Sequence, residues 1–277
     1  MRSLPVFMYH HINRHRGDLV TLTPEDFENH LRVLREMKVE MLFLEEVIQI
    51  LQKEKKLSKP SVALTFDDGH LDNWVYAFPL LKKYQAKATI FVITSWMAEG
   101  ELRGNSDGPK EGMPEIPLHR EVKRNASGGN GSVALRWAEV KAMEESGRVD
   151  IQSHTHFHRD YFSGEDQSWH LRPDQKDELA RDLGLSKELI EKKLHKKCGF
   201  LSWPWGKFDR EAIELAKSLG FEGMVTTEKG VNYPGSEVSA IKRVVAKSGN
   251  PGWFRSRLRI YSHRALGEVY SRISGRI

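Results

Sequence analysis

Two carboxylates stand side by side at the end of a largely apolar stretch of the chain. Asp67 and Asp68 follow the run 61–66 and precede Gly69. Adjacent like charges repel each other, and burial makes their ionised forms still more costly, so the pair needs a nearby cation or a shared proton. A later segment, 154–158, has imidazoles at its first, third and fifth positions. We therefore expect the two segments to meet around a metal ion.

The spacing of the histidines suits metal binding in two different local structures. His154 and His158 are four positions apart, which places both on one face of a helix and also on one face of an extended strand. His156 shares that face only if the segment is extended. One oxygen ligand with two imidazoles is a common catalytic zinc set that leaves room for water or substrate. Such a metal lowers the pKa of its water and polarises a carbonyl group.

Each motif also has an interpretation without catalysis. The aspartate pair alone fits a turn at a strand end, and the histidines alone fit a solvated polar loop. Both motifs lie at the ends of predicted strands, where parallel α/β folds build their sites. Their joint presence therefore favours a metal site, in which one aspartate binds the metal and its neighbour reaches the water.

Apolar runs and amphipathic segments alternate along the first part of the chain. Thr23 is a natural N-cap, and Pro24 fits the first turn of the helix that follows. Pro79 is expected to kink a helix over 71–84. The predicted strands are 5–9, 41–44, 61–66 and 88–93, and the predicted helices are 24–37, 45–55 and 71–84. This alternation predicts parallel strands joined by crossover helices.

A long segment, 97–134, interrupts the pattern with many glycines and prolines, including the run 127–132. Long loops in compact domains are often functional, and a disordered surface insertion is the alternative. Beyond it the alternation resumes, and we expect Gly184 to separate two helices. The further predicted strands are 149–153, 200–203, 223–227 and 240–245, and the further helices are 136–146, 174–183, 186–194 and 209–219.

The overall composition is that of an ordinary soluble domain. The chain has 277 residues and a formal net charge of +5, which suits acidic or polar partners but gives no reason to expect nucleic acid. Cys198 is the single cysteine, which excludes an internal disulfide and points to a reducing compartment. Residues 1–8 are too short an apolar run for a signal or a membrane span. The sequence as written therefore predicts a cytoplasmic protein, unless a leader or anchor has been removed.

The C-terminal segment, 246–277, interleaves arginines with aromatic and aliphatic residues, and Glu268 is its one acid. One interpretation is a final helix that packs on the domain with its arginines in solvent. The other is a weak contact with a membrane surface or an acidic glycan.

The two motifs together resemble those of a known family. Thr65 to Gly69, with His154 and His158, is similar to the first two motifs of the polysaccharide deacetylases, also called the NodB homology domain or carbohydrate esterase family 4. Residues 5–10 resemble the opening of the subgroup that de-N-acetylates poly-N-acetylglucosamine. The segments 79–92, 200–206 and 225–227 are also similar to that subgroup, and the match covers roughly residues 5–245.

This resemblance implies an α/β fold, a distorted and incomplete (β/α) barrel with parallel strands. The barrel would comprise residues 1–245, with an insertion at about 97–134, and a basic tail or helix would follow at 246–277. The implied activity is the metal-dependent removal of acetyl groups from N-acetylated sugars of a glycan.

The same resemblance assigns roles to single residues. Asp68, His154 and His158 would bind the divalent metal, usually zinc, and Asp67 would be the base that deprotonates the metal-bound water. The backbone N–H of Trp205 matches the family's oxyanion donor, and removing one such donor typically costs about 3–4 kcal/mol.

Two family features have no direct counterpart here. The arginine that orients the base is replaced by Ser202, and Arg243 on a late predicted strand is our substitute. The family's last motif carries a histidine that protonates the leaving amine, and no matching motif follows. His10, at the end of the first strand, is a candidate for this acid, and a purely structural histidine is the alternative.

Several aromatic residues are candidates for stacking on sugar rings, and core packing is the alternative for each. They are Trp205, Trp74, Tyr161 and Trp169. Two other functions also stay open: a glycan-binding protein that keeps the fold without turnover, and a related metal hydrolase that acts on a non-sugar amide.

Overall fold

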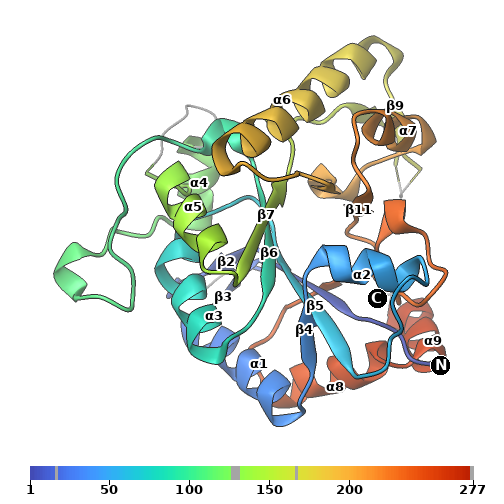
Figure 1. Cartoon of the computed structure of the whole chain (residues 1–277), viewed down its shortest axis with the longest axis horizontal. Helices are drawn as coiled ribbons and strands as arrows, with labels where there is room; N and C mark the ends of the chain where they lie inside the picture. Colours follow the sequence, from blue (N-terminus) through green and yellow to red (C-terminus); the bar gives the residue numbers. More distant parts are fainter. Residues whose placement is uncertain (16–17, 126–131, 166–167, 275–277) are drawn as a thin grey trace.

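A curled parallel sheet forms the centre of the molecule in a computed structural model that describes residues 1–15, 18–125, 132–165 and 168–274 (Figure 1). The strand order is β11-β10-β7-β6-β5-β1-β12, with β4 also paired to β5. The strands are β1 Val6–Tyr9, β4 Glu40–Leu42, β5 Ser61–Phe66, β6 Ala88–Val92, β7 Val149–Ser153, β10 Phe200–Ser202, β11 Gly223–Val225 and β12 Val244–Val245. This arrangement confirms the incomplete (β/α) barrel with parallel strands that the sequence predicted.

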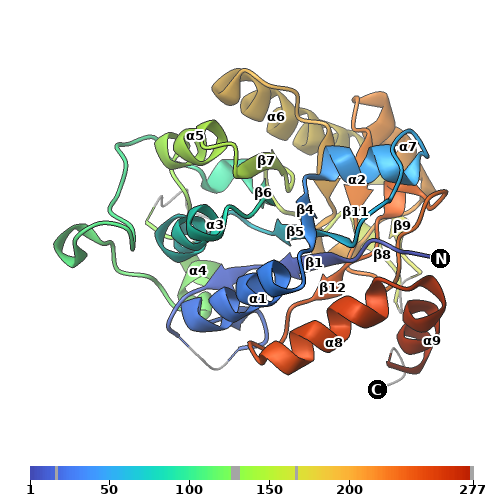
Figure 2. The same ribbon diagram turned by 60° about the horizontal axis from the view of Figure 1, so that its bottom comes forward.

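Helices cover the outside of the curled sheet (Figures 1 and 2). They are α1 Pro24–Glu36, α2 Leu44–Leu51, α3 Phe78–Tyr84, α4 His119–Asn125, α5 Trp137–Glu145, α6 Lys176–Leu194, α7 Arg210–Ser218, α8 Pro251–Tyr261 and α9 Arg264–Ser274. Two small ribbons lie apart from the main sheet: β2 His11–Ile12 with β3 Thr21–Leu22, and β8 Phe162–Ser163 with β9 His170–Leu171.

The strand β5 determines where the chemical groups emerge. All six of its residues are buried, and it pairs with β4 along its first half and with β6 along its second half. On its other edge Tyr9 of β1 is in register with Phe66. The register continues outward, because Val92 of β6 is paired with Ser153 of β7. The carboxyl ends of these strands therefore place His10, Asp67 and His154 at one edge of the barrel.

The last strand segment brings the two ends of the sheet together. An isolated parallel bridge joins Ile241 to Val225 of β11, and Val244 of β12 is paired with Phe7 of β1. Arg243 lies between these two pairings and is fully buried. The positively charged side chain of Arg243 therefore lies in the interior of the barrel.

The local signals for the first helices agree with the structure. Thr23 accepts a hydrogen bond from the backbone N–H of Asp26 at 3.1 Å, and the Asp26 carboxylate accepts the N–H of Thr23 in return. Pro79 lies in the first turn of α3, where its missing N–H costs least, and a π-helix, Asn73–Ala77, precedes it. The predicted irregularity in the helix over 71–84 therefore occurs just before the proline.

Two predictions about helices were wrong. Gly184 does not separate two helices, because α6 continues through it from Lys176 to Leu194. A glycine inside a helix costs about 1 kcal/mol relative to alanine, and the burial of Leu183 and Ile190 on either side more than offsets that cost. The insertion 97–134 is not loop throughout, because it contains the helix α4. Residues 127–131 of its glycine-rich run lie outside the described residues.

The C-terminal segment forms two helices, and the first packs under the barrel beside α1 (Figure 2). The rings of Phe254 and Phe7 are 4.7 Å apart at their centroids, and Leu258 and Tyr261 are also buried. In the part of the chain that the structure describes, no helix has both the length and the apolar character needed to cross a membrane.

Candidate active site

A cavity of about 570 Å³ opens at the carboxyl edge of the barrel. Its wall includes both aspartates of the first motif, His154 and His158 of the second, and His10 from the end of β1. The structure therefore brings together segments that lie far apart in the sequence, as the two motifs predicted. The walls also carry aromatic residues, namely Trp96, Trp203 and Trp205.

Three side chains in this cavity form a ligand set for a metal ion. The Oδ1 atom of Asp68 lies 3.2 Å from Nε2 of His154 and 3.8 Å from Nε2 of His158. One ligand atom from each of the three residues lies within 4.8 Å of the others. A carboxylate oxygen with two imidazole nitrogens is a donor set that divalent zinc and similar metals prefer.

The hydrogen bonds of His154 test whether a cation fits. Its Nδ1 lies 2.8 Å from the carbonyl oxygen of Ser202, which can only accept, so Nδ1 carries a proton. In a neutral ring the remaining nitrogen, Nε2, is then a bare lone pair that faces the Asp68 carboxylate. Two acceptors at this distance need a cation between them or a second proton on the ring. The residues therefore fit a bound metal, and the hydrogen bond to the Ser202 carbonyl orients the His154 ring as such a ligand.

The backbone around the ligands is unusual. Asp68, Thr155 and His158 have φ values of 75°, 65° and 52°, in the left-handed region that non-glycine residues seldom adopt. This conformation at Asp68 turns the second aspartate of the motif back toward the cavity, so that both carboxylates line it. Strain of this kind persists only where the surroundings enforce it, and it clusters at functional sites.

The histidine pair comes together through a turn. His154 and His158 share neither a helix face nor a strand face, which corrects both geometries considered from their spacing. The Thr155 side chain holds the turn by accepting the N–H of His158 at 2.9 Å. His156 points elsewhere, and its Nδ1 lies 2.7 Å from the hydroxyl of Thr94.

Arg243 donates two hydrogen bonds of 2.7 Å to the carboxylate of Asp67. All five N–H groups of a guanidinium are used here: Nε donates to the Thr226 carbonyl, Nη1 to Asp67 and Thr65, and Nη2 to Asp67 and Ser202. The residue proposed from sequence as a substitute for the missing arginine thus contacts the aspartate, and Ser202 joins the same network.

The electrostatics of the cavity keep both carboxylates ionised. Burial raises the pKa of Asp67, but the charges of Arg243 and His154 and the hydrogen bonds from Arg243 bring it below its ordinary value. Burial opposes ionisation of Asp68 as well, yet the close contacts of its carboxylate with His154 and His70 hold its pKa well below the usual range. Burial and the neighbouring His154 lower the pKa of His158 to about 4.

His10 and Trp205 lie on the cavity wall. Nδ1 of His10 is buried and, among the described residues, has no hydrogen-bond partner, and burial lowers the pKa of the ring. Trp205 has a φ of 55°, its ring centroid is 4.4 Å from that of His158, and half of its side chain is exposed. Both positions suit contact with a molecule in the cavity.

The structure does not bring Trp74 and Tyr161 to the cavity. Both are buried in the core: Trp74 donates its indole N–H to the carbonyl of Arg103, and the Tyr161 hydroxyl donates to Asp182. Trp169 also lies off the cavity wall, with the Lys207 ammonium 4.3 Å from its ring centroid. For these three residues the packing interpretation agrees with their positions.

Sequence reasoning missed several residues of the site. His70 directly follows the first motif, and its Nε2 lies 3.0 Å from Oδ2 of Asp68. His119 and Val122 reach the cavity from α4, inside the insertion. The position of His70 next to the motif was a usable signal, whereas nothing in the insertion's composition indicated which residues face the site.

Comparison with known proteins agrees with the geometry. Residues 54–224 match the family model described as polysaccharide deacetylase. The chain belongs to the polysaccharide deacetylase family. The matched segment contains both aspartates and both histidines of the candidate ligand set, whereas His10 and Arg243 reach the site from outside it.

Relatives of this deacetylase extend over most of its length. The YxkH protein of Bacillus subtilis is 30% identical over 250 residues, covering 90% of this chain and 74% of the relative. The poly-β-1,6-N-acetyl-D-glucosamine N-deacetylase of Escherichia coli K12 is 22% identical over 236 residues, and the match covers 79% of this chain but 32% of that protein. The structure of the Streptococcus pyogenes deacetylase PplD has a TM-score of 0.72 at 22% identity and covers 94% and 98% of the two chains, which establishes a shared fold.

Proposed function

We propose that this protein removes acetyl groups from N-acetylated sugar units of a polysaccharide or glycoconjugate, as a metal-dependent hydrolase. One observation carries the proposal: a carboxylate held ionised by Arg243 shares a cavity with the ligand set of Asp68, His154 and His158. Base and metal ligands side by side are what amide hydrolysis requires.

The three ligands would hold a divalent metal, and their oxygen and nitrogen donors make zinc the preferred ion. When bound, such a metal lowers the pKa of water and polarises the acetyl carbonyl. Asp68 is ionised in this site, and His154 is oriented by the Ser202 carbonyl, so these side chains are arranged before any metal arrives.

Asp67 is proposed to accept the proton of the attacking water. Its low pKa keeps it unprotonated near pH 7, and the two-pronged contact with Arg243 prevents its side chain from rotating away. General-base catalysis of this kind typically contributes about 10²–10⁴ in rate.

Two further groups are proposed to complete the reaction. The backbone N–H of Trp205 would stabilise the charge that develops on the acetyl oxygen, since Trp205 lines the cavity and its ring packs against that of His158. His10 would give a proton to the leaving amine. Since burial lowers its pKa, His10 is neutral at rest, and the proton that Asp67 takes from the water would pass to His10 before it protonates the amine.

The aromatic residues of the wall support a sugar as substrate. Trp205 is half exposed beside His158, and Trp96 lies on the same wall, so two indole rings border the cavity. The name of the E. coli relative makes a β-1,6-linked N-acetylglucosamine polymer the first substrate to test. A glycan-binding protein without turnover has less support, because a binding module gains nothing from a buried, ionised carboxylate beside metal ligands.

A substrate panel tests this function. Acetate release is measured on β-1,6- and β-1,4-linked N-acetylglucosamine oligomers and on an acetyl-lysine peptide, with and without a chelator. We expect chelator-sensitive release from at least one glycan and none from the peptide. Release from the peptide alone would support the non-sugar amide hydrolase, and tight glycan binding without any acetate would support the binding protein.

We also propose that the C-terminal segment contacts an anionic membrane surface. Helix α9 exposes Leu266, Val269 and Ile273 by 57%, 55% and 62%, at spacings of three and four that align them on one face. The surrounding segment is basic, with Lys247, Arg255, Arg257, Arg259, Arg264, Arg272 and Arg276. An exposed apolar stripe beside arginines is typical of a helix lying in a membrane interface, whereas an acidic glycan would use the charges alone.

Vesicle flotation separates these two partners. The protein should float with vesicles containing phosphatidylserine and less with phosphatidylcholine alone, and Leu266→Glu with Ile273→Glu should abolish the difference. If that double variant still floats and soluble acidic glycan competes equally, the contact is electrostatic and the glycan is the partner. Absence of flotation for the unchanged protein contradicts the membrane contact.

A further inference from the structure

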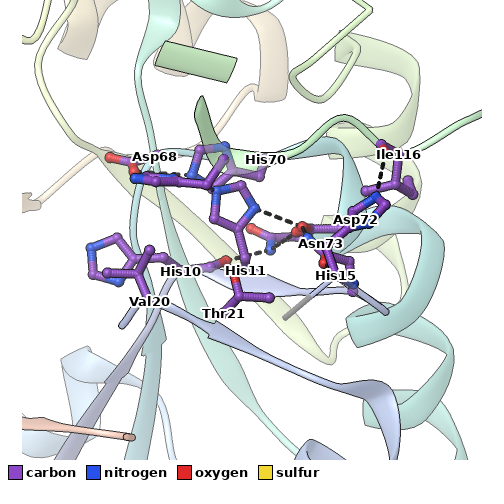
Figure 3. Close-up of polar contacts among 12 residues, drawn as sticks. His10, His11, His15, Val20, Thr21, Asp68, His70, Asp72, Asn73 and Ile116 are labelled. Carbon is purple, nitrogen blue, oxygen red and sulfur yellow. Dashed lines mark hydrogen bonds and ion pairs between the residues drawn. The ribbon is translucent and has the colours of Figure 1, made fainter. Parts of the chain in front are cut away.

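A group of histidines lies behind the metal-ligand Asp68, and the catalytic roles proposed above do not use it (Figure 3). His70 approaches Asp68 from the side away from the other ligands: its Nε2 is 3.0 Å from Oδ2, whereas Oδ1 faces His154. The two oxygens of this carboxylate are therefore divided between a metal-facing and a protein-facing role.

The proton on His70 can be located from its surroundings. Within the described part of the chain, the buried Nδ1 of this ring has no hydrogen-bond partner. A proton there would be left unsatisfied away from water, which costs about 1–3 kcal/mol. The neutral ring therefore carries its proton on Nε2 and donates it to Oδ2 of Asp68.

A second imidazole fixes the orientation of the first. His11 stacks on His70 with ring centroids 3.6 Å apart and an interplanar angle of 15°, and both side chains are almost completely buried. The Nδ1 atom of His11 lies 2.7 Å from Oδ2 of Asp72. Asp72 is in turn held by Asn13 and Asn73. Figure 3 shows these groups running from Asp68 to the Asp72 cluster.

We propose that His70 is a positioning residue that holds Asp68 with Oδ1 toward the metal, and that His11, fixed by Asp72, holds the ring of His70. This inference rests on the proposed metal site. Asp68 needs such support because its backbone is in the left-handed region and its side chain has only the single oxygen Oδ2 free to anchor. Removing a residue that hydrogen-bonds to a metal ligand typically lowers metal affinity by about 10–100-fold.

The stack also connects the metal site to the wall of the cavity. The Nε2 atom of His11 lies 3.1 Å from Nδ1 of His119, which is on helix α4 of the insertion and lines the cavity. His15 contacts the same insertion through the carbonyl of Ile116 at 2.8 Å. The insertion therefore contacts His11, which holds the ring of His70 beside Asp68.

The test measures zinc affinity by competition with a chromophoric chelator, independently of acetate release. His70→Leu removes the N–H group that donates to Asp68 and replaces the ring by an apolar side chain of moderate size. We expect this variant to bind zinc about 10–100-fold more weakly. His70→Gln restores an N–H donor and should recover most of the affinity. His156→Leu is the matched control, because His156 lies between two ligands in sequence yet its ring contacts Thr94 instead, so its zinc affinity should stay close to that of the unchanged protein.

Further readouts separate positioning from folding. Thermal unfolding of the metal-free proteins shows whether His70→Leu is folded, and His11→Phe, which keeps a stacking ring but loses Asp72, should give an intermediate zinc affinity. Equal zinc affinities for the unchanged protein and His70→Leu, or equal weakness in the Leu and Gln variants, would overturn the role of His70. Unchanged affinity in His11→Phe would overturn that of His11.

The outcomes also distinguish this inference from the proposed function. A protein that binds zinc but releases no acetate contradicts the proposed deacetylase, and the affinity series still decides the role of His70. A protein that binds no zinc at all contradicts the metal site, and with it the positioning role.

Discussion

Replacing Arg243 with methionine should affect the proposed base more than any other change that leaves the cavity wall intact. Arg243 gives Asp67 two hydrogen bonds of 2.7 Å, and the pair is buried, with the arginine fully inaccessible. Hydrogen bonds to charged groups are worth about 1.5–3 kcal/mol each, and breaking a buried ion pair by removing one partner costs about 3–5 kcal/mol. A large part of this cost must appear in the folded state of Arg243→Met.

The free energy lost in Arg243→Met appears partly as a lower stability of the fold and partly as a higher pKa of Asp67. The guanidinium lowers the pKa of this carboxyl, so its removal raises the pKa. The more of this roughly 3–5 kcal/mol that protonation relieves, the further the pKa of Asp67 rises. Because the base must be ionised, the acid limb of kcat/KM should move to higher pH by the same amount.

The assay combines pH profiles of acetate release with denaturant unfolding. Arg243→Lys is the first control: a lysine keeps the charge but cannot form the two-pronged contact, so its acid limb should shift less. In the double variant Asp67→Asn with Arg243→Met the uncompensated charge is gone, and the loss of stability should be smaller than the sum of the two single losses. An Arg243→Met protein with unchanged stability and an unchanged acid limb would refute the reasoning.

Four further outcomes are expected. His154→Ala should lose zinc, as measured by metal analysis after dialysis, because only two ligands remain. His10→Gln should keep zinc while kcat falls about 10²–10⁴-fold, and a fall in zinc content instead would make His10 structural. Gly206→Ala should be destabilised by at least about 1–2 kcal/mol, because Gly206 has a φ of 71° and a Cβ there would lie 2.0 Å from Oγ1 of Thr227. An unchanged urea unfolding midpoint would contradict this. The metal-free protein should lose stability as pH falls below about 4. The pKa values of Asp67 and Asp68 are lower in the folded than in the unfolded protein, so protons bind the unfolded state preferentially. A urea unfolding midpoint that does not change between about pH 3 and 6 would contradict the assigned direction.

The sequence was informative where chemistry and local periodicity coincide. The run 61–66 ends in two carboxylates, and it is a buried strand in the structure, with both carboxylates at the cavity. Thr23 and Pro24 marked the start of α1 correctly because capping depends on neighbouring residues only. The parallel strands followed from the alternation of strands and helices, and the incomplete barrel from the resemblance to the family.

Other features depend on contacts that local patterns do not encode. Arg243 reaches Asp67 because Val244, next to it in sequence, is paired with Phe7 of β1, a contact between the two ends of the chain. The continuity of α6 through Gly184 is a balance between helix propensity and tertiary burial, and burial prevails.

The turn at His154–His158 and the roles of the aromatic candidates also depend on contacts that local sequence patterns do not encode. His154 and His158 were paired correctly, but the left-handed backbone that pairs them is set by side-chain hydrogen bonds such as that of Thr155. Trp74 and Tyr161 could not be separated from Trp205 by residue type, since only burial in the folded state distinguishes a core ring from one on a cavity wall.

The central claim is that zinc and Asp67 act together in deacetylation. The most direct measurement is acetate release from an N-acetylglucosamine oligomer together with zinc content, in the same samples, for the unchanged protein and for Asp67→Asn. We predict that release requires zinc, and that Asp67→Asn retains zinc while its release falls about 10²–10⁴-fold. Full release by the zinc-free protein, or by zinc-loaded Asp67→Asn, would contradict the account.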